Sequence, residues 1–192
     1  HYTGEGPPNY SISFIMDDID FSGIGMVGHL FDVNQIEVFK GPQSIIFGPN
    51  AIAGSINITT NNPTPFFTGR LETNYSNDNL ISHSAAIGGP LEKNLTFRIS
   101  AMNYSQNGYR KNLYLNTDDS NKKNESLLRV KFHWHPLEDF SIKYTHIFSV
   151  LDNKLDVWSP DNNIILNTYT DKHGMDSQKS NANAIKISLP DL

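Results

Sequence analysis

Two histidines in the sequence His133-Trp134-His135 have a spacing suited to metal binding, because a strand places alternate side chains on one face. A structural or catalytic metal site needs at least one further protein ligand. No such ligand lies nearby in the sequence, so we interpret the pair as a polar strand face beside a turn. We expect no metal ion and no catalytic role there.

Other patterns with chemical potential are also incomplete. Asp17, Asp18 and Asp20 could form a carboxylate pair or a calcium site, but they lack the spacing of an EF-hand loop, and we predict a solvated strand end. Residues 23–28 fit the pattern G-x-G-x-x-G, but no helix pattern follows, so we expect no dinucleotide site. The motifs Gly-x-Ser-x-Gly and His-Glu-x-x-His are absent, and we expect the chain not to be an enzyme.

Composition excludes further classes of protein. The 192 residues contain no Cys, which excludes disulfide scaffolds, Cys-based metal sites and Cys nucleophiles. The formal net charge of −5 argues against a nucleic-acid partner bound through a basic face. Aromatic residues make up 11% of the chain, which argues against disorder.

Strands must position most side chains, because the hydrophobic pattern has a period of two. In residues 126–134 one face is apolar and the other is charged or polar, and residues 140–148 repeat the pattern after a short polar turn. Two such runs joined in this way predict a β-hairpin. The apolar members of the first run are Leu128, Val130, Phe132 and Trp134, and the polar members are Arg129, Lys131 and His133.

Further alternating runs predict antiparallel strands of about ten residues. They are joined by short connections at 91–94 and 136–139 and by long polar loops at 105–125 and 152–183, although the connection at 77–80 is also short. This layout is typical of an outer-membrane barrel, with apolar side chains facing lipid and charged side chains facing the lumen. A soluble β-sandwich, with the apolar face in a core, fits the same alternation. The runs are 69–76, 82–89, 95–104, 126–134, 140–148 and 184–189.

The first 64 residues have a different, glycine-rich pattern. A strand over 10–21 and a turn over 22–25 precede a short turn over 32–36, where Asp32 occupies a possible N-cap position. Strands over 35–39 and 55–60 follow, separated by turns and by a break at Gly54.

Residues 36–48 and 50–60 resemble the end of the plug domain of TonB-dependent outer-membrane receptors. The two runs are Ile-Glu-Val-Phe-Lys-Gly-Pro-Gln-Ser-Ile-Ile-Phe-Gly and Asn-Ala-Ile-Ala-Gly-Ser-Ile-Asn-Ile-Thr-Thr. The family pattern is approximately V-E-V-L-R-G-P-x-S-x-L-Y-G followed by A-x-G-G-x-I-N-I-x-T, which leads into the first barrel strand. This chain departs from the pattern at Lys40, Phe47, Pro49 and Ala53, where Arg, Tyr, a polar or basic residue and Gly are usual.

The resemblance implies a mainly β fold. It consists of a partial plug at 1–64, built of strands with short turns or helix, followed at 65–192 by antiparallel strands of an incomplete outer-membrane β-barrel. It also implies a fragment of a longer receptor in a Gram-negative outer membrane that takes up a scarce ligand, most often a ferric siderophore, without a resident cofactor. The implied partners are outer-membrane lipid, the iron chelate or another bulky ligand, and the TonB energy-transducing complex, which would act through a segment outside this chain.

The resemblance also indicates candidate site residues. Phe47, Gln43 and Asn50 would face the external ligand, whereas Glu37 and Lys40 would connect the plug to the barrel wall through charge pairs. Phe47 as a packing residue of the plug is an equal alternative. The loops 105–125 and 152–182 would face outside, and the loop around Trp158 is similar to those of siderophore receptors.

Two other functions remain compatible with the strand pattern. A soluble carbohydrate-binding sandwich would use exposed aromatics and Asn-rich loops, and a passive porin or adhesin barrel would need no plug. The sequence does not distinguish siderophore, haem, cobalamin and oligosaccharide ligands.

Overall fold

The computed structural model describes residues 11–24, 30–43, 51–156 and 166–189. Over these ranges the chain forms strands, turns and irregular connections, and no residue in them is helical. The described part accordingly contains no helix of the length and hydrophobicity needed to cross a membrane. The mainly β fold class predicted from the sequence is confirmed.

The four N-terminal strands form one small sheet, which we call the plug sheet. Its strand order is β2-β1-β4-β3, with β1 and β4 parallel and the other pairs antiparallel. The two-residue turn between β1 and β2 has both residues at positive φ, which is the geometry of a type I′ hairpin. The strands are β1 (Ile12–Met16), β2 (Ile19–Asp20), β3 (Val33–Lys40) and β4 (Gly54–Thr60).

The short turn predicted over 32–36 is wrong in extent. Only Asp32 belongs to a turn, at φ 58°, and the strand β3 begins at the next residue. Asp32 therefore caps no helix. Its carboxylate is instead directed away from the plug sheet, toward a cation described below.

Gly41 and Gly54 are required for different structural reasons. Gly41 has φ +88°, a conformation that side chains other than glycine rarely adopt, and it ends β3. Gly54 is not a break between strands, as the sequence had suggested, because it pairs with Lys40 as the first residue of β4. A Cβ atom on Gly54 would lie 2.5 Å from the carbonyl oxygen of Phe39, so close backbone approach requires glycine there.

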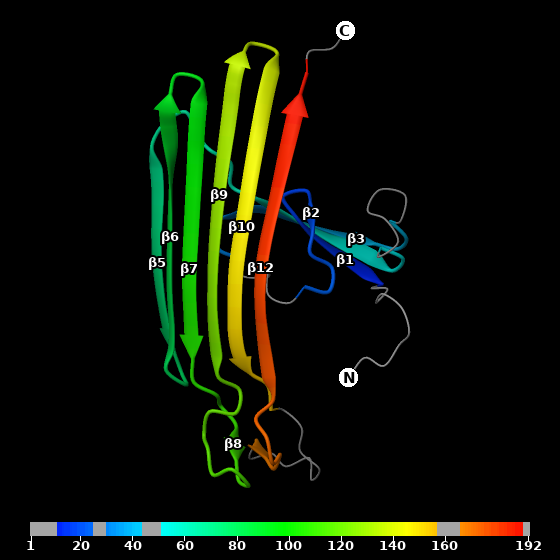
Figure 1. The fold of residues 1–192 in the computed structure, drawn as a ribbon, viewed down its shortest axis with the longest axis vertical. Helices are drawn as coiled ribbons and strands as arrows, with labels where there is room; N and C mark the ends of the chain where they lie inside the picture. Colours follow the sequence, from blue (N-terminus) through cyan, green and yellow to red (C-terminus); the bar gives the residue numbers. More distant parts are fainter. Residues whose placement is uncertain (1–10, 25–29, 44–50, 157–165, 190–192) are drawn as a thin grey trace.

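The following strands form a second, six-stranded antiparallel sheet, which we call the wall (Figure 1). All six runs predicted from the alternation are present, including the hairpin of β9 and β10. The strands reach 15 residues, longer than the predicted ten. They are β5 (Thr68–Ser76), β6 (Leu80–Glu92), β7 (Leu95–Gln106), β9 (Lys123–Leu137), β10 (Phe140–Lys154) and β12 (Met175–Ser188).

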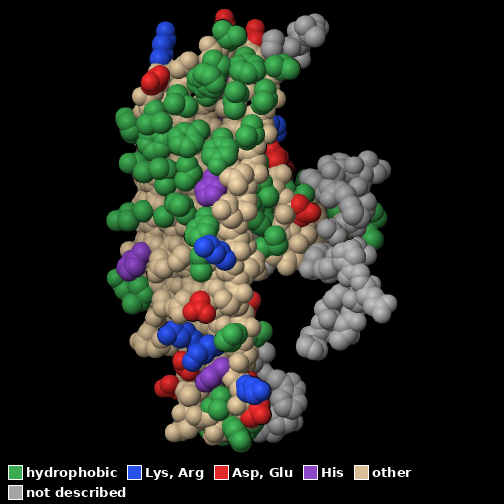
Figure 2. All heavy atoms as spheres, in the orientation of Figure 1, with side chains coloured by type: hydrophobic (Ala, Val, Ile, Leu, Met, Phe, Trp, Pro, Cys, Tyr) green, Lys and Arg blue, Asp and Glu red, His purple; other side chains and the backbone are tan. Residues whose placement is uncertain are grey.

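The two faces of the wall have opposite chemistry. The inner face, toward the plug sheet, buries Arg98, Arg129 and Lys131, whereas the outer face exposes large apolar side chains such as Ile87 and Leu71. Figure 2 shows hydrophobic side chains spread over the outer face on the side of the short turns, with charged side chains at the tip of that end and again toward the loop end. A soluble sandwich would bury the apolar face, so this arrangement is that of a barrel wall facing lipid.

The buried apolar core lies between the two sheets. It combines Met16, Phe21, Phe31 and Ile58 with inward-facing residues of the wall. The wall contributes Ala86, Met102, Leu127 and Ile147. The plug sheet is thus packed against the inner face of the wall, and Figure 1 shows its strands crossing the long wall strands.

The edges of the wall, β5 and β12, have no strand partner on their outer sides within the described ranges. An unpaired edge cannot lie in lipid, because each unsatisfied backbone group there costs several kcal/mol. The wall therefore requires further strands to close. Two short strands, β8 (Lys111–Asn112) and β11 (Asn167–Thr168), pair in parallel between the long loops at the other end.

We predict that Ile99→Lys destabilises the protein strongly in a lipid bilayer. Ile99 lies on the outer face of β7 between Ile87 and Val130, and a lysine near mid-bilayer costs about 2–4 kcal/mol. The free energy of unfolding measured by urea titration in lipid vesicles tests this.

Leu91→Lys is the matched control, because Leu91 is an exposed residue at the turn end of the wall. A lysine near the interface costs only about 0–1 kcal/mol. Equal destabilisation by the two substitutions would contradict the assignment of the outer face to lipid.

Candidate functional site

Three buried cations on β7 and β9 meet the plug sheet. The alternation of the two strands places Arg98, Arg129 and Lys131 on the inner face, and Arg98 lies directly opposite Lys131 in the register. Each of the three donates a hydrogen bond to a plug residue. We call these cations, together with Asp17 and Asp32, the docking cluster.

Arg98 and Asp32 form a two-pronged ion pair. Arg98 Nε donates to Asp32 Oδ2 at 2.7 Å, and Arg98 Nη2 donates to Asp32 Oδ1. Asn61 adds a third hydrogen bond to the carboxylate, at 2.9 Å. Burial alone would raise the pKa of Asp32, but the hydrogen bonds from Arg98 and Asn61 and the charges of Arg98 and Arg129 outweigh it and hold the pKa below its ordinary value.

Asp17 fills the same role for Lys131. Lys131 Nζ donates to Asp17 Oδ1 at 2.8 Å and to the carbonyl oxygen of Thr60 at 3.2 Å. The backbone N–H and the hydroxyl of Thr60 both donate to the Asp17 carboxylate, at 2.9 and 2.6 Å. The side chain of Asp17 is therefore buried and fully engaged, and the solvated strand end predicted for it is wrong.

Arg129 completes the docking cluster without a carboxylate of its own. Its Nη2 donates to the carbonyl oxygen of Phe31 at 2.9 Å, and its side chain is 2% exposed. The three cations of the wall thus meet two carboxylates and two backbone carbonyls of the plug, those of Phe31 and Thr60. Breaking one partner of such a buried pair leaves an uncompensated charge, so the cluster fixes one position of the plug against the wall.

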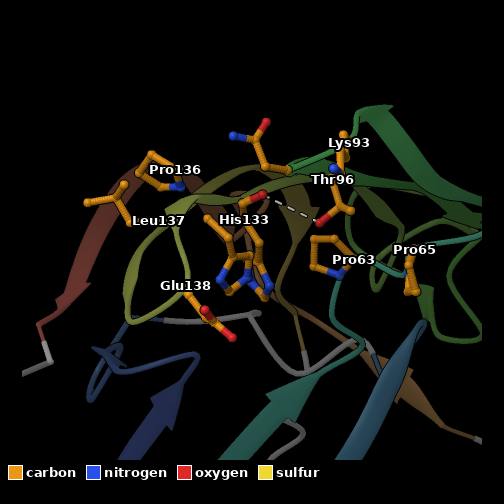
Figure 3. A pocket seen from close by; sticks show the side chains of 10 residues that line it. Pro63, Pro65, Lys93, Thr96, His133, Pro136, Leu137 and Glu138 are labelled. Atoms are coloured by element: carbon orange, nitrogen blue, oxygen red, sulfur yellow. Dashed lines mark hydrogen bonds between the residues drawn. The ribbon is translucent and has the colours of Figure 1, made fainter.

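A cavity of about 1020 Å³ lies at the short-turn end of the wall. Figure 3 shows Pro63 and Pro65 of the segment between the two sheets on one side, and His133, Pro136 and Leu137 of β9 with Glu138 of the β9–β10 turn on the other. His135 also lines this cavity, so both histidines of the 133–135 pair face it. Among the described residues, no group of three or more His, Asp or Glu side chains is placed to hold a metal ion.

The two long loops are joined at the opposite end of the wall. Asn112 Nδ2, Thr168 Oγ1 and Thr170 Oγ1 all donate to Asp156 Oδ2, at 2.7–2.9 Å. The hydrogen bond from Lys154 is the main reason why the pKa of Asp119 lies below its ordinary value. These contacts make loops 107–122 and 155–174 one connected structure, although residues 157–165 lie outside the described ranges.

The sequence-predicted ligand residues are only partly described. Phe47 and Asn50 lie outside the described residues, as does Trp158. Gln43 is half-buried, and its backbone N–H donates to the carbonyl oxygen of Ala51, which closes the turn after β3.

Glu37 and Lys40 lie on β3. Glu37 accepts a hydrogen bond from Asn57 of β4 at 2.9 Å, within the plug sheet, and Lys40 is exposed. Their contact with a barrel wall stays a prediction, because β3 is the edge of the plug sheet and the wall described here borders only part of that sheet.

Sequence reasoning missed the docking cluster. Its acids lie 66 and 114 positions from their partners, so no local spacing could reveal the pairs. A signal did exist in the wall, where Arg98, Arg129 and Lys131 all occupy the polar face of strongly alternating strands. Cations on a buried face require carboxylates opposite them. Asp17 and Asp32, in turns that precede the wall in the sequence, could have been identified as those carboxylates.

We predict that Arg98→Ala destabilises the protein by about 3–5 kcal/mol, because it leaves the buried carboxylate of Asp32 without its cation. The free energy of unfolding, followed by Trp fluorescence in detergent, measures the loss. Glu72→Ala serves as control, since it breaks an exposed ion pair with Arg70 and should leave the free energy unchanged. A loss in the control as large as that of Arg98→Ala would contradict the role of the docking cluster.

Lowering the pH should reduce the stability that the ion pair of Asp32 and Arg98 contributes. The pKa of Asp32 is lower in the folded protein than its ordinary value of 3.8, so the stabilisation by its charge is present above pH 3.8 and is lost as the pH falls through the lower folded value. Asp32→Asn removes this titration. Urea midpoints measured at a series of pH values should therefore fall less steeply in acid for Asp32→Asn than for the unsubstituted protein, and parallel curves would refute the expectation.

Known proteins that resemble this chain in sequence or structure identify its fold. No family model matches the chain. The Pesticin receptor of Yersinia enterocolitica is 24% identical over 129 residues, which cover 67% of this chain and 19% of the receptor, and that of Yersinia pestis matches equally. The chain thus spans about a fifth of the length of these curated relatives.

Solved structures match over most of the chain. The ferric yersiniabactin uptake receptor FyuA from Yersinia pestis has a TM-score of 0.77 at 16% identity, covering 92% of this chain and 29% of that one. The ferripyoverdine receptor of the outer membrane of Pseudomonas aeruginosa has a TM-score of 0.64 at 15% identity, covering 90% and 24%. The ferric-catecholate import receptor Fiu from E. coli K12 has a TM-score of 0.64 at 18% identity, covering 77% and 21%.

The relatives and solved structures named above are described as receptors. The resemblance carried by residues 36–60 is therefore confirmed at the level of structure: the chain has the fold of the TonB-dependent siderophore receptors.

Proposed function

We propose that this chain is part of a TonB-dependent outer-membrane transporter that takes up a ferric siderophore. The observation that carries the proposal is the plug sheet held by buried ion pairs against the charged face of a wall whose other face is apolar. A plug packed in this way blocks a lumen, and a blocked lumen suits gated uptake better than passive diffusion. The same observation weighs against the porin and adhesin alternatives.

We also propose the division into a plug part at 1–64 and a barrel part at 65–192. The plug sheet ends at Thr60 and the wall begins at Thr68, which supports a boundary between them. The unpaired edges of the wall support the further proposal that more barrel strands belong to the same protein.

Binding and release would depend on coupling between two sites. A ligand bound by the external loops and by Gln43, Phe47 and Asn50 would stabilise one position of the plug, and the TonB complex would draw energy from the inner membrane to disturb it. The joined loops 107–122 and 155–174 support an external role, because a preorganised surface loses less entropy on binding.

Uptake of radioactive ferric chelates by cells with and without the intact gene tests this function. Ferric yersiniabactin, a ferric catecholate and ferripyoverdine are suitable probes, because they represent the chemistries named for the matched receptors. We expect deletion to abolish uptake of one probe and the full-length gene to restore it.

A proton uncoupler provides the control for energy coupling. It should abolish uptake while leaving binding of the same probe to the cell surface intact. Uptake that is unaffected by deletion for every chelate would refute the proposal, and uptake that resists the uncoupler would favour a passive barrel.

A further inference from the structure

A row of basic residues crosses the inner face of the wall on the short-turn side of the docking cluster. His133 of β9 lies opposite Lys143 of β10, and Lys143 lies opposite Lys186 of β12. We call these three residues the basic row. Like charges directly opposite each other on adjacent strands are destabilising, so the two lysines weaken the wall unless an anion lies over them.

A polar cavity of about 270 Å³ lies between the basic row and the plug. Lys131 lines it beside the row, and the plug side includes Asp17, Asp18 and Asn57. Lys131 is already engaged by Asp17 and is buried. Lys143 is exposed, and it forms no ion pair within the described part of the chain.

Asp18 is the plug residue that reaches the basic row. Its Oδ2 atom lies 3.1 Å from Lys186 Nζ, and both side chains are well exposed. Asp18 occupies the second position of the β1–β2 turn at φ 66°, where glycine would be unstrained. A plug turn thus holds a carboxylate against Lys186, in a contact open to water, and Lys143 lines the same cavity.

The basic surface continues toward the short-turn end of the wall. His133 lines the cavity of about 270 Å³ and also the larger cavity of about 1020 Å³, which Figure 3 shows. Lys93 and His135 line the larger cavity as well. Positive or protonatable side chains therefore follow one another along the wall from beneath the plug to its end.

We propose that the basic row is a binding site for an oxyanion, such as a carboxylate group of an anionic chelate, and that Asp18 occupies this site when the plug is docked. Lysine ammonium groups are point charges that bind carboxylate oxygens without a fixed geometry, which suits a transient site. A cavity of about 270 Å³ accommodates one acidic group or a small carboxylate. The site's role as a step in passage along the wall rests on the proposed transport function.

Citrate binding to the purified full-length protein tests the site directly. We expect Asp18→Asn to bind citrate roughly fivefold more tightly than the unsubstituted protein in low-salt titration calorimetry, because the competing carboxylate is gone. Asp18→Gly should show the same gain and relieves the positive φ, so it separates loss of the charge from damage to the turn.

Combining Lys143→Gln and Lys186→Gln with Asp18→Asn should abolish the gain. Lys179→Gln is the matched control, because Lys179 lies on the opposite face of β12, over the ring of Phe148, and its loss should change nothing. Citrate affinity that does not rise in either Asp18 variant, or a gain that persists without the two lysines, would overturn the site.

Uptake measurements test the role of the basic row in passage of the chelate. The double variant Lys143→Gln/Lys186→Gln should take up the labelled chelate several-fold more slowly while binding it at the cell surface as tightly as the unsubstituted protein. Unchanged uptake would show that cargo does not use the basic row. If the unsubstituted protein takes up no chelate, the proposed function fails, and the citrate titration still decides whether the site exists.

Discussion

The wall of this protein buries three cations, and the position of the plug follows from that constraint. Arg98, Arg129 and Lys131 lie on strands whose other face is apolar, so they can point only inward. An isolated charge in such a place costs several kcal/mol, and the cost is offset when a carboxylate and further hydrogen bonds surround it. Asp17 and Asp32 provide this compensation from two separate turns of the plug sheet.

The same constraint explains the backbone at these two acids. Both have positive φ, a conformation that costs most L residues about 1–2 kcal/mol but that Asp tolerates better than most. In this geometry each carboxylate projects from the end of a strand toward the wall. Hydrogen bonds from Thr60 and Asn61, which follow one another at the end of β4, hold the two side chains in place. One end of the plug sheet therefore presents two carboxylates to the wall in fixed positions.

The fold was predictable because its main signal is local. Alternation along 126–134 assigns each residue to a face, and the structure keeps those faces, with Arg129 and Lys131 inside and Trp134 outside. Alternation could not predict which face of the strands is buried, because the strands of a sandwich and of a barrel wall have the same alternating sequence pattern. Asp32 was misplaced since its partner lies 66 residues away, and strand length was underestimated because polar residues continue the strands beyond the apolar band.

The neighbouring acids Asp17 and Asp18 divide two tasks that one residue could not perform. Asp17 is buried with Lys131, so separating that pair exposes two charges to a poorly hydrated site and resists small movements of the plug. Asp18 and Lys186 meet in water, where an ion pair contributes at most about 1 kcal/mol and exchanges readily. Rotation of the Asp18 side chain away from Lys186 therefore frees that lysine while the pairs at Lys131 and Arg98 still hold the plug, which places the opening of the basic row before the release of the docking cluster.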